Sequence, residues 1–223
     1  MSTTTRQRVG IWVITVALTV GTIMGFVAMI LSSQDQQVSQ EVIRKYQEEA
    51  SAYQGKVASQ KAKYEKRTNE LSGKYYAGLN EQKVLVGPFD PSSIKELQVE
   101  TIKDGDGEVI NKDTAYATFY IGFTPDGNIF DGSIEGESLK VPLLVQPGEV
   151  ISGWSEGMEG KKIGGIYKLL IPSEKAYGAS GSGDNIKPNT PLIFIVMPIE
   201  RIERFRAPQI TQEVIRAYGQ QQQ

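Results

Sequence analysis

The pattern of apolar and polar residues divides the chain into five stretches. A short polar start at residues 1–8 is followed by an uncharged apolar run at residues 9–31. Residues 32–83 are rich in Gln, Glu, Lys, Ala and Tyr and lack proline, which is typical of a long polar helix. Short apolar segments then alternate with turn sequences over residues 84–204, and a polar tail occupies residues 205–223.

The apolar run at residues 9–31 predicts a transmembrane anchor. It has about 23 residues and would extend roughly 34 Å as a helix, enough for a hydrocarbon core of about 30 Å. A cleaved signal peptide has a shorter apolar region and a small-residue cleavage site, so an uncleaved span is favoured. Arg6 and Arg8 precede the run, and the next basic residue is Arg44. The positive-inside rule therefore predicts a single-pass protein of the cell membrane with a cytoplasmic N-terminus and an extracytoplasmic remainder.

The long polar stretch at residues 32–83 predicts a helical stalk. An apolar residue recurs every seven positions, but the companion position of the heptad becomes polar along the helix, which favours a solvated spacer over a stable coiled coil. Gly21 and Gly25 have a spacing that pairs membrane helices. A homo-oligomer through the span or the stalk therefore remains an alternative. The recurring residues are Ile43, Ala50, Val57, Tyr64 and Leu71. The companion position, three residues further on, is occupied first by Tyr46 and Tyr53 and then by Gln60, Arg67 and Lys74.

Residues 84–204 predict a compact domain built mainly of strands. Turn sequences rich in Gly, Pro, Asp and Asn separate the apolar segments, and only one short helix fits, around residues 152–159. The sequence DGDG at 104–107 begins like a calcium loop, but the twelfth position would be Ala115 instead of Glu, so it predicts only a turn. The strand segments are LQVETI, TAYATFYIGF, KVPLLV, IYKLLI and PLIFIVMPIERI.

Composition restricts the chemistry available to this chain. There is no cysteine and no histidine, which excludes disulfides, thiolate or imidazole metal ligands, a Cys nucleophile and a Ser-His-Asp triad. The net charge of −2 gives no basic footprint for nucleic acid. We therefore expect no metal, no cofactor and no nucleic-acid partner, and a function that depends on shape, desolvation and fixed hydrogen bonds.

Several motifs in the compact domain resemble the FK506-binding-protein (FKBP) family of peptidyl-prolyl isomerases. The motifs EVI-x-GW and AYGA are specific when found together at this spacing. The resemblance implies an α+β fold in which an antiparallel half-barrel of five or six strands wraps around one short helix. It also implies isomerase activity on proline-containing polypeptides, without a cofactor. The matching segments are VETIKDGDGE, ATFYIGFTPDGNIFDGS, PGEVISGWSEGMEGKKIGG, LLIPSEKAYGASGSG and PLIFIVMPIERI.

The resemblance also assigns a pocket for a proline ring. Trp154 corresponds to the floor of that pocket, and Gly153 beside it leaves room for a close backbone approach. The hydroxyl of Tyr177 and the amide of Ile151 correspond to the groups that contact carbonyls. Val141 replaces an aromatic residue found in many members, and Ser182 and Asn185 make one rim more polar. The catalytic positions implied are Tyr120, Phe130, Asp131, Trp154, Tyr177 and Phe194, and the substrate-binding positions are Val150, Ile151, Ile186 and Val141.

Taken with the predicted anchor, these motifs favour a membrane-anchored isomerase that acts on unfolded, exported polypeptides outside the cytoplasm. Two alternatives stay open at this level, a non-catalytic binding module with the same fold and a structural role for the span and stalk. The sequence QEVIRAY at 212–218 nearly repeats QEVIRKY at 40–46. Both predict short amphipathic helices that pack on each other, or else the repeat is a coincidence of two helical sequences.

Overall fold

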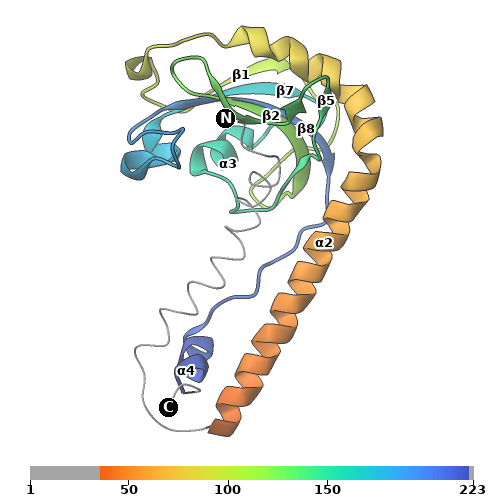
Figure 1. Ribbon diagram of the computed structural model, residues 1–223, viewed down its shortest axis with the longest axis vertical. Coiled ribbons are helices and arrows are strands. Elements are labelled where there is room, and N and C mark those ends of the chain that lie inside the picture. Colours follow the sequence, from red (N-terminus) through yellow and green to blue (C-terminus); the bar gives the residue numbers. More distant parts are fainter. Residues whose placement is uncertain (1–35, 221–223) are drawn as a thin grey trace, which may run out of the picture. The chain divides into compact units, whose positions relative to one another are not determined.

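The computed structural model describes residues 36–220, which divide into two compact units (Figure 1). The larger unit spans Val57–Phe205 and contains all the strands. The described part of the smaller unit consists of residues 36–56 and 206–220. Helix α2, Gln36–Asn80, contributes to both units.

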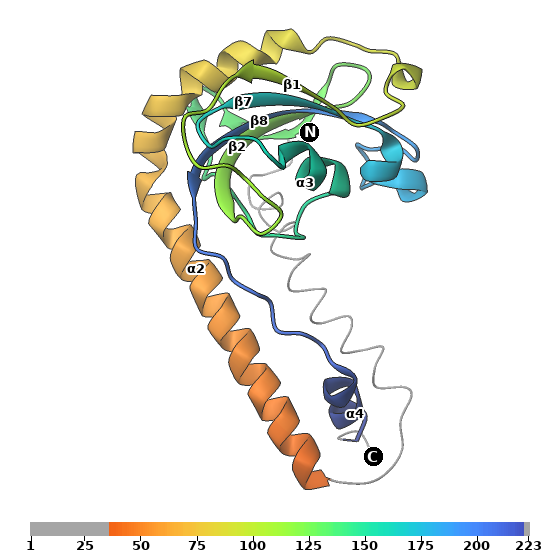
Figure 2. The same cartoon turned by 180° about the vertical axis from the view of Figure 1, so that it is seen from behind.

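An antiparallel sheet of six strands forms the centre of the larger unit. Its strand order is β1-β7-β8-β2-β3, and β6 also pairs with β2. Helix α3, Ser152–Met158, lies against one face of this sheet (Figure 2). This arrangement confirms the predicted antiparallel sheet around one short helix. The strands are β1 (Gln98–Lys103), β2 (Tyr116–Phe123), β3 (Ile129–Gly132), β6 (Leu143–Val145), β7 (Ile166–Ile171) and β8 (Leu192–Arg201).

Short elements connect these strands. A separate two-stranded hairpin consists of β4, Ile134–Glu135, and β5, Ser138–Leu139. Each apolar segment predicted as a strand contains one, whereas β3, β4 and β5 were not predicted because they are too short for a clear alternation. The single-turn 3₁₀ helices are η1 (Glu81–Leu85), η2 (Pro91–Ser93), η3 (Ser173–Lys175) and η4 (Gly178–Ser180).

Strands β2 and β8 are apolar on both faces, which explains why their sequences are continuous apolar runs. Alternate residues of a strand point to opposite faces of the sheet. One set packs into a helix-side cluster that includes Tyr64, Leu71, Phe119, Ile121, Ile195 and Met197. The other set packs into a pocket-side cluster that includes Tyr116, Trp154, Met158, Tyr167, Phe194 and Val196. The sheet therefore has a separate core on each side.

The second half of α2 is not a solvated spacer, contrary to the expectation from its polar composition. Tyr64, Leu71 and Leu79 are almost fully buried and belong to the helix-side cluster. Val57, at the preceding heptad position, is 37% exposed. The heptad pattern thus reflects packing against the sheet for Tyr64 and Leu71, and the compact unit begins earlier in the sequence than the predicted boundary at residue 84.

A cluster of polar side chains also joins α2 to β8. The hydroxyl of Tyr64 donates a hydrogen bond to Glu200, and Nη1 and Nη2 of Arg67 lie 2.6 and 3.3 Å from its two carboxylate oxygens. Burial alone would raise the pKa of Glu200, but the hydrogen bonds from Arg67 and Tyr64 hold that pKa below its ordinary value. The carboxylate therefore stays charged and fixes the register of α2 on the sheet.

The side chain of Gln146 makes two hydrogen bonds to the end of the larger unit, where Gln60 also bonds to the carbonyl of Glu203 and Arg204 pairs with Asp113. Gln146 is buried, and its amide group donates a hydrogen bond to the carbonyl of Glu203 at 3.0 Å. Its Oε1 accepts a hydrogen bond from the backbone N–H of Phe205, also at 3.0 Å. Both bonds go to backbone that follows β8, where the ladder has ended.

The two copies of the repeat come together in the smaller unit. Helix α4, Gln212–Gln220, contains the second copy, and the first lies in α2. The rings of Tyr46 and Tyr218, which occupy equivalent positions, meet edge to face at 6.4 Å. Nε2 of Gln47 also lies 3.4 Å from the hydroxyl of Tyr218. Of the two alternatives, the structure therefore supports packing of the two copies on each other, although the first copy is part of the 45-residue α2 and not a short helix.

Three expectations fall on parts of the chain outside the described residues. They are the cytoplasmic N-terminus at 1–8, the anchor at 9–31 and the helix-pairing glycines Gly21 and Gly25. Within residues 36–220, no helix is both long enough and apolar enough to span a bilayer.

The packing of α2 generates a first prediction about stability. A chain of residues 57–205 should resist denaturant clearly better than one of residues 84–205, although both contain every strand. The shorter chain loses Tyr64, Leu71 and Leu79, and burial of each large apolar side chain is worth about 1.5–3 kcal/mol. Equilibrium urea unfolding of both chains measures the difference. If the two chains had the same urea midpoint and the same slope of unfolding free energy against urea, this half of the helix would have no structural role.

Candidate active site

Helix α3 positions Trp154 on the pocket side of the sheet. The backbone N–H groups of Trp154 and Ser155 both donate to the carbonyl of Ile151, at 3.0 and 3.2 Å, which starts the helix. A side chain at Gly153 would place its Cβ 2.3 Å from Cγ2 of Ile171, so only glycine allows α3 to lie this close to β7. The close backbone approach expected at Gly153 is therefore present.

The polar group of Trp154 is satisfied away from the pocket. Its Nε1–H donates a 2.8 Å hydrogen bond to the hydroxyl oxygen of Tyr116, a buried residue of β2. Burial raises the pKa of Tyr116 above its ordinary value, so its hydroxyl stays neutral. Because the indole nitrogen already has a partner, the rest of the ring offers only apolar surface to the residues that pack around it.

Two aromatic rings meet Trp154 edge to face, and a third packs against one of them. Its ring centroid lies 5.1 Å from that of Phe194 and 5.5 Å from that of Tyr120, at interplanar angles of 69° and 75°. Phe130 meets Phe194 at 5.6 Å and 85°. These separations suit the quadrupoles of aromatic rings. Strands β2, β3 and β8 thus each contribute one ring to this group.

Gly122 makes this arrangement possible and was not singled out from the sequence. It pairs with Phe194 on one side and with Asp131 on the other. A Cβ at this position would lie 2.7 Å from the ring of Phe130 and 2.8 Å from the ring of Phe194. The available signal was an isolated glycine inside a strand sequence, which often marks a close approach.

A tyrosine and a carboxylate form the polar edge of the site. The hydroxyl of Tyr120 donates to Oδ2 of Asp131 at 2.5 Å, and the N–H of Gly132 donates to Oδ1 at 2.8 Å. Burial raises the pKa of Tyr120, and the negative charge of Asp131 raises it further. The carboxylate is therefore held in one orientation by two donors, and the phenol remains protonated.

Tyr177 supplies a second phenol next to this edge. Burial is the main cause that raises the pKa of Tyr177, and the negative charge of Asp131 raises it further. Tyr177 packs at the border of the pocket-side cluster and leads into η4. Among residues 36–220 its hydroxyl makes no hydrogen bond with another protein group, so it is a neutral donor available to a bound carbonyl.

The structure brings together nine of the ten predicted site positions. Ile186 is buried in a loop that is closed by two backbone hydrogen bonds with Ser182, at 2.8 and 3.2 Å. Val141 lies apart from the others, because it packs against the helix-side cluster. Its position after the β4–β5 hairpin, which the sequence did not predict, explains the difference. The positions that share the pocket-side cluster or its polar edge are Tyr120, Phe130, Asp131, Val150, Ile151, Trp154, Tyr177, Ile186 and Phe194.

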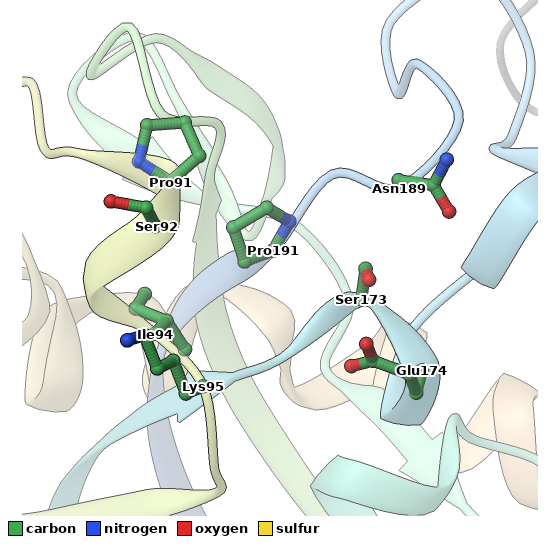
Figure 3. Close-up of a pocket in the computed structure, with 8 residues that line it drawn as sticks. All are labelled: Pro91, Ser92, Ile94, Lys95, Ser173, Glu174, Asn189 and Pro191. Atoms are coloured by element: carbon green, nitrogen blue, oxygen red, sulfur yellow. The ribbon is translucent and has the colours of Figure 1, made fainter.

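A separate cavity of about 320 Å³ lies between η2 and the segment around η3 (Figure 3). Its lining mixes short polar side chains with two prolines and one residue of each charge, and none of it belongs to the aromatic cluster. The lining residues are Pro91, Ser92, Ile94, Lys95, Ser173, Glu174, Asn189 and Pro191. In the part of the chain that the structure describes, no group of three or more acidic side chains has the arrangement of a metal site.

Comparisons with known proteins agree with this geometry. Residues 106–197 match the family model described as FKBP-type peptidyl-prolyl cis-trans isomerase. The FK506-binding protein of Neisseria meningitidis serogroup B is 42% identical over 101 residues, which cover 45% of this chain and 91% of that protein. The chain belongs to the FKBP-type peptidyl-prolyl cis-trans isomerase family. It is therefore an enzyme that catalyses rotation about X–Pro peptide bonds.

Two longer FKBP-type relatives align beyond the isomerase domain. The peptidyl-prolyl cis-trans isomerase Mip of Chlamydia trachomatis is 35% identical over 143 residues, which cover 63% of this chain and 55% of that protein. The probable isomerase FkpA of N. meningitidis serogroup B is 34% identical over 159 residues, covering 71% of this chain and 54% of that protein. This chain is thus similar to about half of each of these proteins.

The close contacts at Gly122 generate a second prediction. Replacement of Gly122 by Ala should lower kcat/KM for X–Pro exchange by about tenfold or more, because the new methyl group displaces the rings of Phe130 and Phe194. Gly148 is a suitable site for the control Gly148→Ser, since it lies in an exposed turn with no atom near its Cβ direction, although its φ of +84° will cost some stability. Kinetics should be measured well below both unfolding temperatures. Normal kinetics of Gly122→Ala would contradict the inferred packing of the pocket walls.

Proposed function

We propose that this chain is a membrane-anchored isomerase that seats a proline ring over Trp154 and acts on exported polypeptides outside the cytoplasm. The observation that carries the pocket assignment is the aromatic arrangement around Trp154, whose only polar group is already bonded to Tyr116. The ring carbons of proline are apolar, and they can contact such a surface without leaving a buried polar group unpaired.

The reaction requires no proton transfer, which suits a chain without histidine or cysteine. Rotation about an X–Pro bond must overcome a barrier of about 18–20 kcal/mol, because it breaks amide resonance. The twisted amide is less dipolar than the planar one, so a water-poor pocket favours it relative to bulk water. A thousandfold acceleration needs only about 4 kcal/mol of selective stabilisation.

Hydrogen bonds from the rim would hold the substrate while the amide twists. Tyr177 offers a neutral hydroxyl beside Asp131, and the resemblance to FKBPs implies that the backbone amide of Ile151 binds a second carbonyl. Asp131 would act through Tyr120, which it fixes by a hydrogen bond. These groups orient the flanking carbonyls, and the aromatic walls keep water away from the rotating bond.

The proposed location rests on the sequence of residues 1–31. An uncharged run long enough to span the hydrocarbon core follows two arginines, and the next basic residue is Arg44. In this topology the isomerase domain meets chains that are folding outside the cytoplasm. Uncatalysed X–Pro isomerisation takes tens to hundreds of seconds, which is slow enough to limit their folding.

Catalysis by the named pocket predicts a graded series of losses. In cis/trans exchange of short X–Pro peptides with the full chain, Trp154→Leu should lower kcat/KM most. Tyr177→Phe and Asp131→Ala should each lower kcat/KM by about two- to tenfold, which is the change in rate expected from the loss of one hydrogen bond. Tyr75→Phe is the matched control, because Tyr75 packs against Phe119 on the opposite face. Full activity in the folded Trp154→Leu variant would contradict this pocket, and an inactive folded parent would favour a binding module.

The anchor predicts a topology that is tested separately. The full chain, with a different peptide tag at each end, should stay in the membrane fraction at high salt, whereas a chain lacking residues 1–31 should be released. Protease supplied from outside the cytoplasmic membrane should remove only the C-terminal tag. A full chain found in the soluble fraction, or an N-terminal tag cleaved from outside, would contradict the proposed orientation.

A further inference from the structure

The β4–β5 hairpin connects the polar edge of the active site to helix α2. It begins directly after β3, the strand that carries Phe130 and Asp131, and Figure 1 shows β5 beside α2. Ile134 pairs with Leu139, and Glu135 pairs with Ser138. Since the hairpin has only two short strands, its own ladder is too small to fix its position.

Two side chains of α2 bond to this hairpin: the hydroxyl of Tyr76 lies 3.4 Å from the carbonyl oxygen of Gly136, and Ser72 holds the outer edge. The hydroxyl oxygen of Ser72 accepts a hydrogen bond from the backbone N–H of Leu139 at 2.8 Å, and both residues are buried. The next amide along the strand, that of Lys140, points the other way and donates to the carbonyl of Ser133 at 2.8 Å. Ser72 therefore supplies the partner that an edge strand lacks on its open side.

The inner side of the hairpin holds both polar residues of the site. The hydroxyl oxygen of Ser133 accepts a bond from the N–H of Tyr120 at 3.0 Å, and the N–H of Ser133 donates to the carbonyl of Tyr120 at 2.8 Å. Gly132, whose N–H binds Asp131, has its carbonyl oxygen 2.9 Å from Nζ of Lys140. Tyr120 and Asp131 are thus fixed by residues that are themselves bonded to Lys140.

We propose that Ser72 is a positioning residue for isomerisation, and that α2 sets the geometry of the Tyr120–Asp131 pair through the β4–β5 hairpin. The path consists of the hydrogen bonds described, and every step lies within the larger unit. Ser72 bonds to Leu139, so its influence passes through Leu139, Lys140 and Ser133. The helix then contributes to catalysis as well as to stability.

The test compares a bond-removing variant with a variant that only loosens packing. Ser72→Ala in the full chain should lower kcat/KM for X–Pro exchange by about three- to thirtyfold, the range expected for a residue that couples to a site at a distance. Ser72→Thr keeps the acceptor oxygen and should stay within about threefold of the parent. Leu79→Val loosens the same helix without removing a hydrogen bond, and should lower the unfolding temperature while leaving kcat/KM nearly unchanged.

A surface variant keeps the proposal testable if Ser72→Ala does not fold. Lys140→Met removes the bond to the carbonyl of Gly132 from an exposed side chain, and should lower kcat/KM by about two- to fivefold. Lys112→Met is the matched control, because Lys112 is also exposed and makes no bond to the hairpin. Parent kinetics in both Ser72→Ala and Lys140→Met would overturn the proposal. So would a loss in Leu79→Val as large as that in Ser72→Ala.

Discussion

The packing of the larger unit depends on covering both faces of the paired strands β2 and β8. Each strand carries large apolar side chains in both directions, so neither face is left for water. Helix α3 and the strand connections cover one face, and the second half of α2 covers the other. Because Phe119 and Tyr120 are neighbours on β2, the helix-packed core and the pocket share a single backbone.

This shared backbone explains how an enzyme without histidine or cysteine can hold a precise site. Isomerisation depends on the position of apolar walls and a few neutral donors, not on a titrating group. The apolar walls and the donors must therefore be held in position by packing. The rings of Phe130 and Phe194 pack closely on Gly122, and helix α3 packs closely on β7 at Gly153, and neither position has space for a methyl group. The polar edge is fixed by hydrogen bonds to a hairpin that α2 supports.

The sequence predicted the isomerase domain better than its surroundings, for physical reasons. Trp154, Tyr177 and Phe194 belong to motifs with fixed spacing, and nine of the ten site positions proved to lie together. Val141 did not, because the short strands β4 and β5 leave no readable alternation and shift the residues that follow. Ser72 carries no signal in a polar helix, since one serine among many reveals no partner 67 positions away. The burial of Tyr64 and Leu71 was visible as a heptad, but the same spacing fits a partner helix or a sheet.

The two bonds made by Gln146 have a mechanical consequence. A force applied to the chain beyond Phe205 acts first on the bonds that hold residues 203–205, among them the two bonds of the buried Gln146 amide to the carbonyl of Glu203 and the N–H of Phe205. The load therefore reaches these bonds before it reaches the ladder of β8, whose residue Phe194 forms part of the pocket. These bonds therefore separate the strand that carries Phe194 from the segment that follows residue 205.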